Sequence, residues 1–461
     1  MRRKLWLFSF LAAFMAAGQP AEGAGGQDPN RSGATVGKYG ARIALDRKDG
    51  IYKSGETAVC RITLTRGGRP LKGVKARMTM KWEARIIATR DFETTGAPVE
   101  FSYRSDKPGW VYFGFEVLDE NGRPLSGPGV CKHHMKKTVV SEIGAVFDMD
   151  RIASPVREPG DFDEFWAKRR AEVRAAPLEP ELTELDSGIA GIRLFAVRFP
   201  VVRGIMASGY LAYPANARRG SLPAQIFFQS MTYGDVPRKT ALGPAVRGAI
   251  AFAATWHGLP CGRDGEYYRQ TLRRYHQGGK RGFGDREKWV SGDMFFRVMR
   301  ELDFLKTRPE WDGRTLVASG GSLGGAQSAF AAMIDKNVTL ALINVPSFCE
   351  CNAAEAGRTP YRAFRQNPDP AFFDFGFYFD AVNFGRRITC EVYVCTGFTD
   401  ESCFPSNVIA FYNAIPAATK KKLTTDPRTG HFGTTLNIKG NARVSEIFRG
   451  IAIGELPPGT P

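Results

Sequence analysis

The feature that most constrains the fold is a glycine-rich turn between two apolar segments. Residues 316–319 have the pattern of a buried strand, and residues 326–334 have that of a helix. Between them the chain reads Gly320-Gly321-Ser322-Leu323-Gly324, a G-x-S-x-G motif. A serine on a tight strand-to-helix turn exposes its hydroxyl oxygen, and the flanking glycines leave room for the strained backbone. The segment therefore predicts a nucleophilic serine, Ser322, on a strand–turn–helix unit.

Helical and strand-like patterns alternate through the rest of the C-terminal part of the chain. A helix is expected to begin near Asp161, because Asp161 and Glu164 have the spacing of a capping box before an aromatic face. Further strands are expected at 192–199, 207–213, 224–228, 249–254, 340–345 and 392–395, and a further helix at 294–305. This alternation predicts an α/β domain with a mostly parallel sheet and helices on both faces, in which chemistry lies at the carboxyl ends of the strands.

An all-β region is expected before this domain. Four β-rich runs are separated by turns such as Arg66-Gly67-Gly68 and Asn121-Gly122, and they lie at 58–64, 74–82, 99–103 and 110–117. Strands of this length and spacing are typical of a small immunoglobulin-like sandwich. We therefore expect a β-sandwich accessory domain at 38–140 and a catalytic α/β domain at 141–461.

The all-β region carries much of the positive charge of the chain. Residues 38–140 contain 20 Lys plus Arg and 11 Asp plus Glu, a net charge of +9 out of +17 for the whole sequence. A solvated basic face is the simplest interpretation, and contact with an acidic glycan or an anionic envelope surface is the alternative. No nucleic-acid partner is expected, because no known nucleic-acid-binding motif accompanies the charge.

The N-terminus has the pattern of an export signal. Arg2, Arg3 and Lys4 precede an apolar stretch at 5–17, and small residues follow to Ala24. This stretch is too short to span a bilayer comfortably, so no stable membrane insertion is expected. We expect a cleaved signal peptide at 1–24, a linker at 25–37 and a secreted or periplasmic mature protein.

Composition excludes several other architectures. The 461 residues are 43% hydrophobic, with apolar residues in short runs and no fixed-period repeat, which argues against a polytopic membrane protein, a solenoid or a coiled coil. Among the eight cysteines, Cys60 and Cys131 could form a disulfide in the all-β region or remain two buried thiols. The cysteine spacings do not fit a structural zinc site, so neither a metal nor another cofactor is expected.

A nucleophilic serine needs a base, and the chain has five histidines. His133 and His134 belong to the all-β region, and His276 lies in a polar stretch. His257 follows a predicted strand and is a candidate for substrate binding, with a structural role as the alternative. His431 lies in a Gly-flanked loop near the C-terminus, from which an imidazole can reach the serine, and is the predicted base.

The base needs a carboxylate to orient it, and Asp400 fits best because it follows the predicted strand at 392–395. Glu401 is the neighbouring alternative. The less favoured carboxylates lie in helical or turn contexts and are Asp374, Asp380 and Asp426. The chain order serine, aspartate, histidine is typical of α/β-hydrolases. The oxyanion hole is expected to use the backbone N–H groups of Leu323 and Met231, the latter in the loop after the strand at 224–228.

Several motifs together resemble the acetyl xylan esterase and cephalosporin-C deacetylase family, which is carbohydrate esterase family 7 of the α/β-hydrolases. The resemblance covers about 161–454, through the segments 161–166, 319–325, 344–346, 378–384, 397–406 and 430–433. It implies Ser322 as nucleophile, Asp400 as orienting acid and His431 as base. The chain differs from the family pattern in having Leu323 where glutamine is usual and Gln229-Ser230-Met231 where His-Gly-Tyr is usual.

The sequence thus predicts an exported serine esterase that removes acetyl or other short acyl groups from an acetylated oligo- or polysaccharide. One alternative is an esterase or peptidase for another acyl substrate, which the same three residues would support. The other is a non-catalytic glycan- or surface-binding protein on a hydrolase fold. Assembly into an oligomer is left open.

Overall fold

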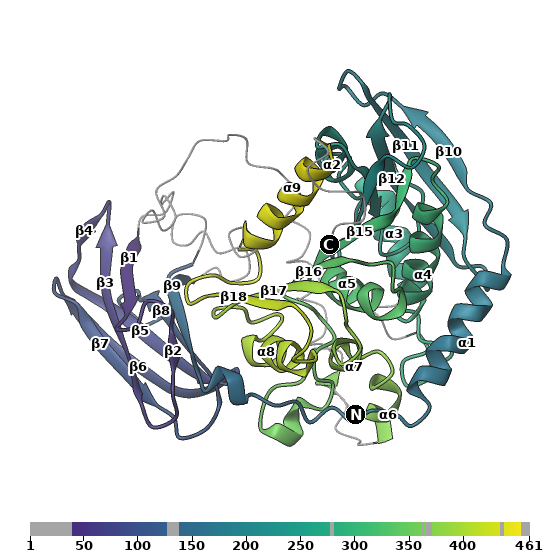
Figure 1. Cartoon of the computed structure of the whole chain (residues 1–461). Helices are drawn as coiled ribbons and strands as arrows, with labels where there is room; N and C mark the ends of the chain where they lie inside the picture. The colour runs from purple at the N-terminus through teal and green to yellow at the C-terminus, as the bar shows by residue number, and fades with distance from the viewer. Residues whose placement is uncertain are drawn as a thin grey trace, which may run out of the picture. The chain divides into compact units, whose positions relative to one another are not determined.

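The computed structural model describes residues 39–126, 138–276, 281–361, 364–365, 371–433 and 438–452. The chain divides into two compact units, residues 1–149 and 150–461, and each is described by itself (Figure 1). Within the described ranges, no helix combines the length and the apolar character that crossing a membrane requires. The expected signal peptide lies outside the described residues, as do Cys131, His133 and His134.

The first unit is a sandwich of two β-sheets. One sheet contains β1 (Gly40–Leu45), β3 (Thr57–Arg66), β4 (Arg69–Pro70) and β7 (Val99–Arg104). The other has the order β2 (Ile51–Tyr52), β9 (Val139–Phe147), β8 (Gly109–Val117), β5 (Lys72–Trp82), β6 (Arg85–Thr95). Alternate residues of β3, such as Ile62 and Leu64, meet Phe113 and Phe115 of β8 in one hydrophobic core. The expected all-β region is therefore confirmed.

One expected boundary of this unit needs correction. The boundary placed after Val140 falls inside β9, which pairs antiparallel with β8 as far as Phe147, so the unit extends to Met149. Of the two alternatives for Cys60 and Cys131, the structure has Cys60 as a buried free thiol on β3, and Cys131 lies outside the described residues. Burial of this thiol in the core follows from the same alternation that buries Ile62.

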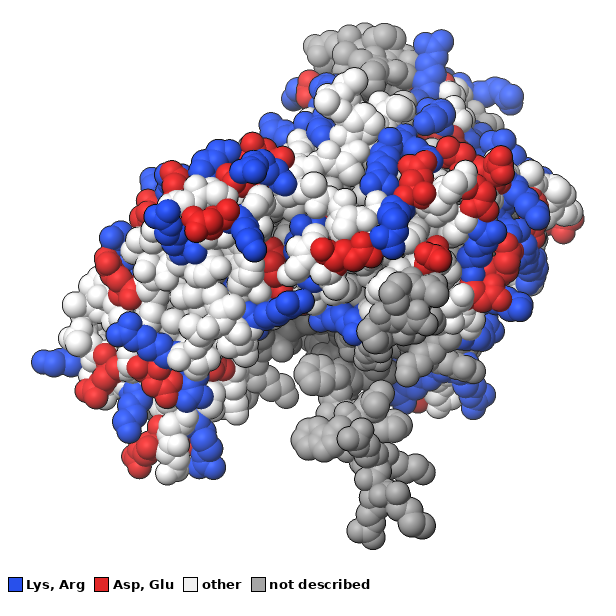
Figure 2. Space-filling model, turned by 90° about the horizontal axis from the view of Figure 1, so that it is seen from below, with Lys and Arg blue, Asp and Glu red and all other residues white. Residues whose placement is uncertain are grey.

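Charges of both signs are interspersed on the surface. Figure 2 shows acidic side chains among the basic ones over the visible face. In the first unit, basic side chains on the strands and turns pair with acidic neighbours, as in Arg77 with Asp91 and Arg61 with Glu100. The positive charge of this unit is thus partly compensated locally.

The second unit is built on a nine-stranded sheet. Its strand order is β10 (Glu181–Leu185), β11 (Ile192–Pro200), β12 (Met206–Pro214), β14 (Ile250–Ala254), β13 (Leu222–Phe228), β15 (Trp311–Gly321), β16 (Leu340–Asn344), β17 (Glu391–Gly397), β18 (Lys421–Asp426). The strands from β14 to β18 are parallel, and β10, β11 and β12 pair antiparallel beside them. The expected mostly parallel sheet is confirmed.

Helices cover both faces of this sheet (Figure 1). On one face, even-numbered residues of β13 and β15 such as Ile226 and Ala318 share a core with α1 (Phe162–Ala175), α4 (Asp293–Lys306), α5 (Leu323–Ile334), α7 (Ala381–Gly385) and α8 (Pro405–Ala414). On the opposite face lie α2 (Lys239–Val246) and α9 (Ile438–Ala452). The remaining helices are α3 (Gly265–His276) and α6 (Ala371–Gly376). Alternation along each strand explains why both faces are apolar.

The strand order places a topological switch point at the carboxyl edge of the sheet. From β13 the chain passes through α2 to β14 on one side, and it then returns to β15 on the other side of β13. Connections that leave neighbouring strands in opposite directions open a space above the carboxyl ends, where ligands bind in sheets of this type. Ser322 follows β15 and Met231 follows β13, so both lie at this switch point.

A carboxylic acid is buried without compensation in α4. Glu301 has no exposed surface, and neither carboxyl oxygen has a hydrogen-bond partner among the described residues. Burial raises the pKa of Glu301 to about 8. The folded protein therefore holds this proton at pH values where the unfolded chain releases it.

We expect Glu301→Gln to stabilise the protein progressively as the pH rises from about 5 to about 8. Over this range Glu301 is ionised in the unfolded chain and protonated in the folded protein. Each rise of one pH unit therefore lowers the free energy of unfolding of the unaltered protein by up to about 1.4 kcal/mol. Glutamine has a similar shape and cannot ionise. The Tm of both proteins at about pH 5 and about pH 8 measures the effect. A Tm difference between them that does not change with pH would contradict it.

Candidate active site

Ser322 occupies a strained turn between β15 and α5. Its φ and ψ are 55° and −117°, a conformation that non-glycine residues rarely adopt. The flanking glycines permit this turn, because a Cβ on Gly320 would lie 2.4 Å from the carbonyl oxygen of Gly324. A Cβ on Gly324 would lie 2.1 Å from the carbonyl oxygen of Phe228. The local sequence thus holds the Ser322 side chain at the sharp bend that the motif predicted.

Asp400 and His431 lie in contact on two neighbouring loops. Nδ1 of His431 is 2.8 Å from Oδ2 of Asp400, whose side chain is fully buried. The other carboxylate oxygen of Asp400 accepts hydrogen bonds from the backbone N–H groups of Ser402 (2.7 Å) and Cys403 (3.0 Å). These bonds fix the carboxylate, so it can hold the imidazole in one tautomer.

The two loops meet because β17 and β18 are adjacent and parallel. The N–H of Phe398 bonds to the carbonyl of Asp426, and the N–H of Thr399 bonds to that of Thr429. Gly397 lets the chains approach closely, because a Cβ there would lie 1.9 Å from the carbonyl oxygen of Thr429. Ser322, Asp400 and His431 therefore come from loops at the same edge of the sheet, after β15, β17 and β18.

The environment of His431 favours its protonated form. Burial lowers the pKa of His431, but the negative charge of Asp400 and the hydrogen bonds with Asp400 and Cys403 outweigh burial and raise the pKa above its ordinary value. An imidazole in this setting is a strong proton acceptor, because the imidazolium that forms is stabilised by the adjacent carboxylate.

The loop after β13 is bound to the Ser322 turn. The hydroxyl of Ser230 donates to the backbone carbonyl oxygen of Gly321 (2.7 Å). The side-chain amide of Gln327 donates to the backbone carbonyl oxygen of Gln229 (3.2 Å). Leu323 is the first residue of α5, where backbone N–H groups have no partner within the helix. Leu323 follows Ser322 directly, and the loop that carries Met231 is bound to the same turn through Ser230, while the oxyanion hole itself stays a prediction.

His257 has the structural position that was the alternative to a role in substrate binding. His257 is 3% exposed, and both of its ring nitrogens are occupied: Nε2 lies 3.2 Å from the carbonyl oxygen of Gly234, and Nδ1 accepts from the N–H of Leu259 (3.0 Å). Burial lowers its pKa to about 3, so the ring stays neutral. His257 therefore holds the segment after β14 together.

The alternative carboxylates have structural positions. Asp380 caps α7 by accepting from the N–H of Val382 (3.0 Å), and Asp426 closes a turn by accepting from the N–H of Arg428 (2.7 Å). Asp374 is an exposed residue of α6, and Asp400 rather than Glu401 contacts His431. Asp161 precedes α1 as predicted, but its side chain does not cap the helix.

Two residues near Ser322 were not predicted. Oγ of Ser347, in the loop after β16, lies 3.3 Å from Oγ of Ser322 and 3.5 Å from Sγ of Cys403. Cys403 lies in the loop of Asp400, where its position three residues after the aspartate could have indicated it. The apolar run around Ser347 contains no comparable signal.

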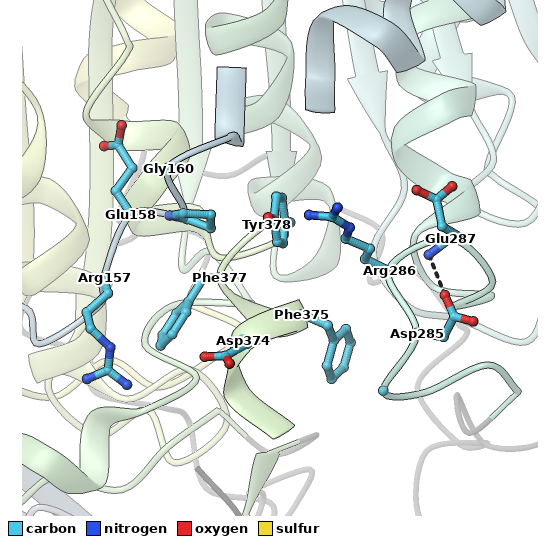
Figure 3. A pocket seen from close by; sticks show the side chains of 12 residues that line it. Arg157, Glu158, Gly160, Asp285, Arg286, Glu287, Asp374, Phe375, Phe377 and Tyr378 are labelled. Carbon is cyan, nitrogen blue, oxygen red and sulfur yellow. Dashed lines mark hydrogen bonds between the residues drawn. The ribbon is translucent and has the colours of Figure 1, made fainter. Parts of the chain in front are cut away.

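A pocket of about 840 Å³ lies on another part of the second unit, away from the Ser322 turn (Figure 3). Arg286 and Tyr378 lie beside each other in its wall, with the guanidinium 4.5 Å from the ring centroid. Arg286 also pairs with Asp161 (3.0 Å), which explains why Asp161 does not cap α1. Neither Ser322, Asp400 nor His431 lines this pocket. In the described ranges, no three His, Cys, Asp or Glu side chains are grouped so as to hold a metal ion.

The chain is similar to known acetyl esterases. The family model for acetyl xylan esterase (AXE1) matches residues 147–438. Acetyl esterase Axe7A of Xylanibacter ruminicola is 28% identical over 322 residues, which are 68% of this chain and 70% of that protein.

Solved structures share the fold of the second unit. The acetyl xylan esterase from Paenibacillus sp. R4 superposes with a TM-score of 0.57 at 22% identity, over 65% of this chain and 98% of that one. Acetyl xylan esterase 1 from Thermoanaerobacterium sp. JW/SL YS485 gives 0.55 at 21%, over 65% and 97%. With more than half of its length matched by the family model, the chain belongs to the acetyl xylan esterase family of carboxylic ester hydrolases, which have the α/β-hydrolase fold.

Proposed function

We propose that this protein is an exported serine esterase that removes acetyl groups from carbohydrate, with Ser322 as nucleophile, His431 as base and Asp400 as the acid that orients it. The observation that carries the proposal is the contact between His431 and the buried, hydrogen-bonded Asp400 at the same sheet edge as the strained Ser322 turn. The acetylated carbohydrate is proposed from the family, and export is proposed from the N-terminal sequence.

The mechanism follows from these positions. Ser322 Oγ attacks the ester carbonyl carbon while its proton passes to Nε2 of His431. The oxyanion that forms accepts hydrogen bonds from the N–H groups of Leu323 and Met231, each donor lowering the barrier by about 3 kcal/mol. Collapse of the intermediate releases the sugar hydroxyl, which takes the proton from His431. Water, deprotonated by His431, then releases acetate and restores Ser322.

We propose that the acyl group of the substrate enters a small cavity beside Cys403. A cavity of about 10 Å³ is bordered by Cys403, Tyr361 and Val408, and this is room for a group of about the size of one water molecule. A methyl group is similarly small, whereas a longer acyl chain would have to displace buried side chains.

We expect the mature protein to hydrolyse 4-nitrophenyl acetate with a kcat/KM at least about tenfold above that for the octanoate ester, and to release acetate from acetylated xylan. A tenfold ratio corresponds to about 1.4 kcal/mol, which lies within the usual cost of overpacking a core, about 1–3 kcal/mol. The acetate, butyrate and octanoate esters give the chain-length profile, and acetate release is measured with the polymer. Equal rates for the three esters, or no acetate from xylan, would contradict the proposal.

A further inference from the structure

Ser347 is in direct contact with the proposed nucleophile. Its Oγ lies 3.3 Å from Oγ of Ser322, and its backbone N–H donates to the carbonyl oxygen of Ser322 (2.9 Å). The Ser347 side chain is buried, with 3% of the residue exposed. The contact joins a buried hydroxyl to the partly buried hydroxyl of Ser322.

The loop that carries Ser347 is strained. Val345, Phe348 and Glu350 have φ values of 36°, 59° and 61°, in the region that non-glycine residues avoid. Such strain persists where surrounding contacts over-determine the backbone, and it is concentrated at functional sites.

Buried polar contacts hold this strained backbone in place. The carboxylate of Asp380 accepts from the N–H groups of Glu350 (3.2 Å) and Cys351 (2.7 Å). Arg358 forms a two-pronged, buried ion pair with Glu350. The N–H of Val345 bonds to the carbonyl of Cys395 on β17. The placement of Ser347 beside Ser322 is thus fixed by the fold.

Ser347 also contacts a thiol in the loop that carries Asp400. Its Oγ lies 3.5 Å from Sγ of Cys403, a residue that helps to raise the pKa of His431. The N–H of Cys403 bonds to Asp400, so the thiol is held in the same loop as the orienting carboxylate. The hydroxyl and the thiol form a polar bridge from the nucleophile to the loop that carries Asp400.

We propose that Ser347 is a positioning residue of the esterase, whose hydroxyl, supported by the thiol of Cys403, holds Ser322 Oγ with its proton directed to His431. This inference rests on the proposed function. In the resting site the Cys403 thiol donates to Ser347 Oγ, and the Ser347 hydroxyl donates to one lone pair of Ser322 Oγ. On attack the Ser322 proton moves to His431 Nε2, while Ser347 and Cys403 keep their own protons, so no net charge moves along the bridge.

The test compares Ser347→Ala and Ser347→Thr with Ser328→Ala. The hydroxyl of Ser328 is buried in α5, where it donates to the carbonyl oxygen of Gly324 (2.8 Å), so Ser328→Ala is a matched loss of a buried serine hydroxyl. A hydrogen bond of ordinary strength corresponds to about a 3- to 10-fold change in rate. We expect Ser347→Ala to lower kcat for 4-nitrophenyl acetate by this factor at unchanged KM, and Ser347→Thr to restore kcat to within about twofold.

A second pair tests the bridge without altering Ser347. Cys403→Ala should lower kcat, and Cys403→Ser, which retains a donor and an acceptor, should retain more of it. The Tm of each variant identifies those that are folded. A folded Ser347→Ala with the kcat of Ser328→Ala, or a Cys403→Ala with the kcat of Cys403→Ser, would overturn the inference. Absence of esterase activity in the unaltered protein would overturn the proposed function, and this inference with it.

Discussion

Ser322→Ala should lower kcat for 4-nitrophenyl acetate by about 10⁴-fold or more. The reaction proposed here begins with attack by Ser322 Oγ, and no other group at the bend between β15 and α5 replaces that oxygen when the side chain is alanine. Removing any member of a serine–histidine–aspartate triad leaves only the residual catalysis of the oxyanion hole and of binding. The measurement is the steady-state rate of the variant, prepared free of unaltered enzyme.

Ser319→Ala is the matched control for that experiment. Ser319 lies three residues before Ser322 on β15, and its hydroxyl donates to the carbonyl oxygen of Ile226 (3.1 Å) inside the sheet. Its loss removes a buried serine hydroxyl without touching the turn. We expect this control to retain its kcat, and a Ser322→Ala variant that did the same would remove Ser322 from the mechanism.

Asp400→Asn should lower kcat by about 10⁴-fold and should move the pH profile. An amide has the shape of the carboxylate but stabilises the wrong tautomer of His431 and does not stabilise the imidazolium, and this exchange has an effect of about that size in a serine protease triad. Glu401→Gln is the control, because Glu401 is the neighbouring carboxylate that the sequence left as an alternative. A larger loss in Glu401→Gln than in Asp400→Asn would reverse the assignment.

The pH dependence follows from the raised pKa of His431. The base works only when its imidazole is neutral, so activity is lost as the pH falls through that pKa. Asp400 raises the pKa of His431, and the acid limb of kcat/KM should therefore lie above the ordinary pKa of histidine. In Asp400→Asn the residual activity should have its acid limb at lower pH. An unchanged limb in that variant would mean that another group controls the profile.

Patterns in the sequence predicted the central strands of the second unit because those strands are buried on both faces. The runs at 224–228, 316–319 and 340–345 lie in β13, β15 and β16, and most residues of these runs are buried. The edge strands β10 and β18 were missed, because their sequences, ELTEL and KKLTTD, are polar and only half-buried. Strand β6 was missed for the same reason at the edge of its sheet.

The candidate site was predictable where a residue type and a position after a strand coincide. Ser322, Asp400 and His431 each follow a strand, and the contact between Asp400 and His431 depends on the neighbouring order of β17 and β18. His257 also follows a strand, but its ring is turned into the interior, which spacing along the chain does not reveal. Ser347 was not predictable, since its place depends on strained backbone angles at non-glycine residues.

The central claim is that Ser322 is the group that carries the acyl intermediate. The most direct measurement is mass spectrometry of the unaltered protein after reaction with a fluorophosphonate, which modifies activated serines covalently. We predict one equivalent of label on the peptide that contains Ser322, formed at the rate at which esterase activity is lost, and none in Asp400→Asn over the same time. Label on a different residue, or loss of activity without label on Ser322, would contradict the account.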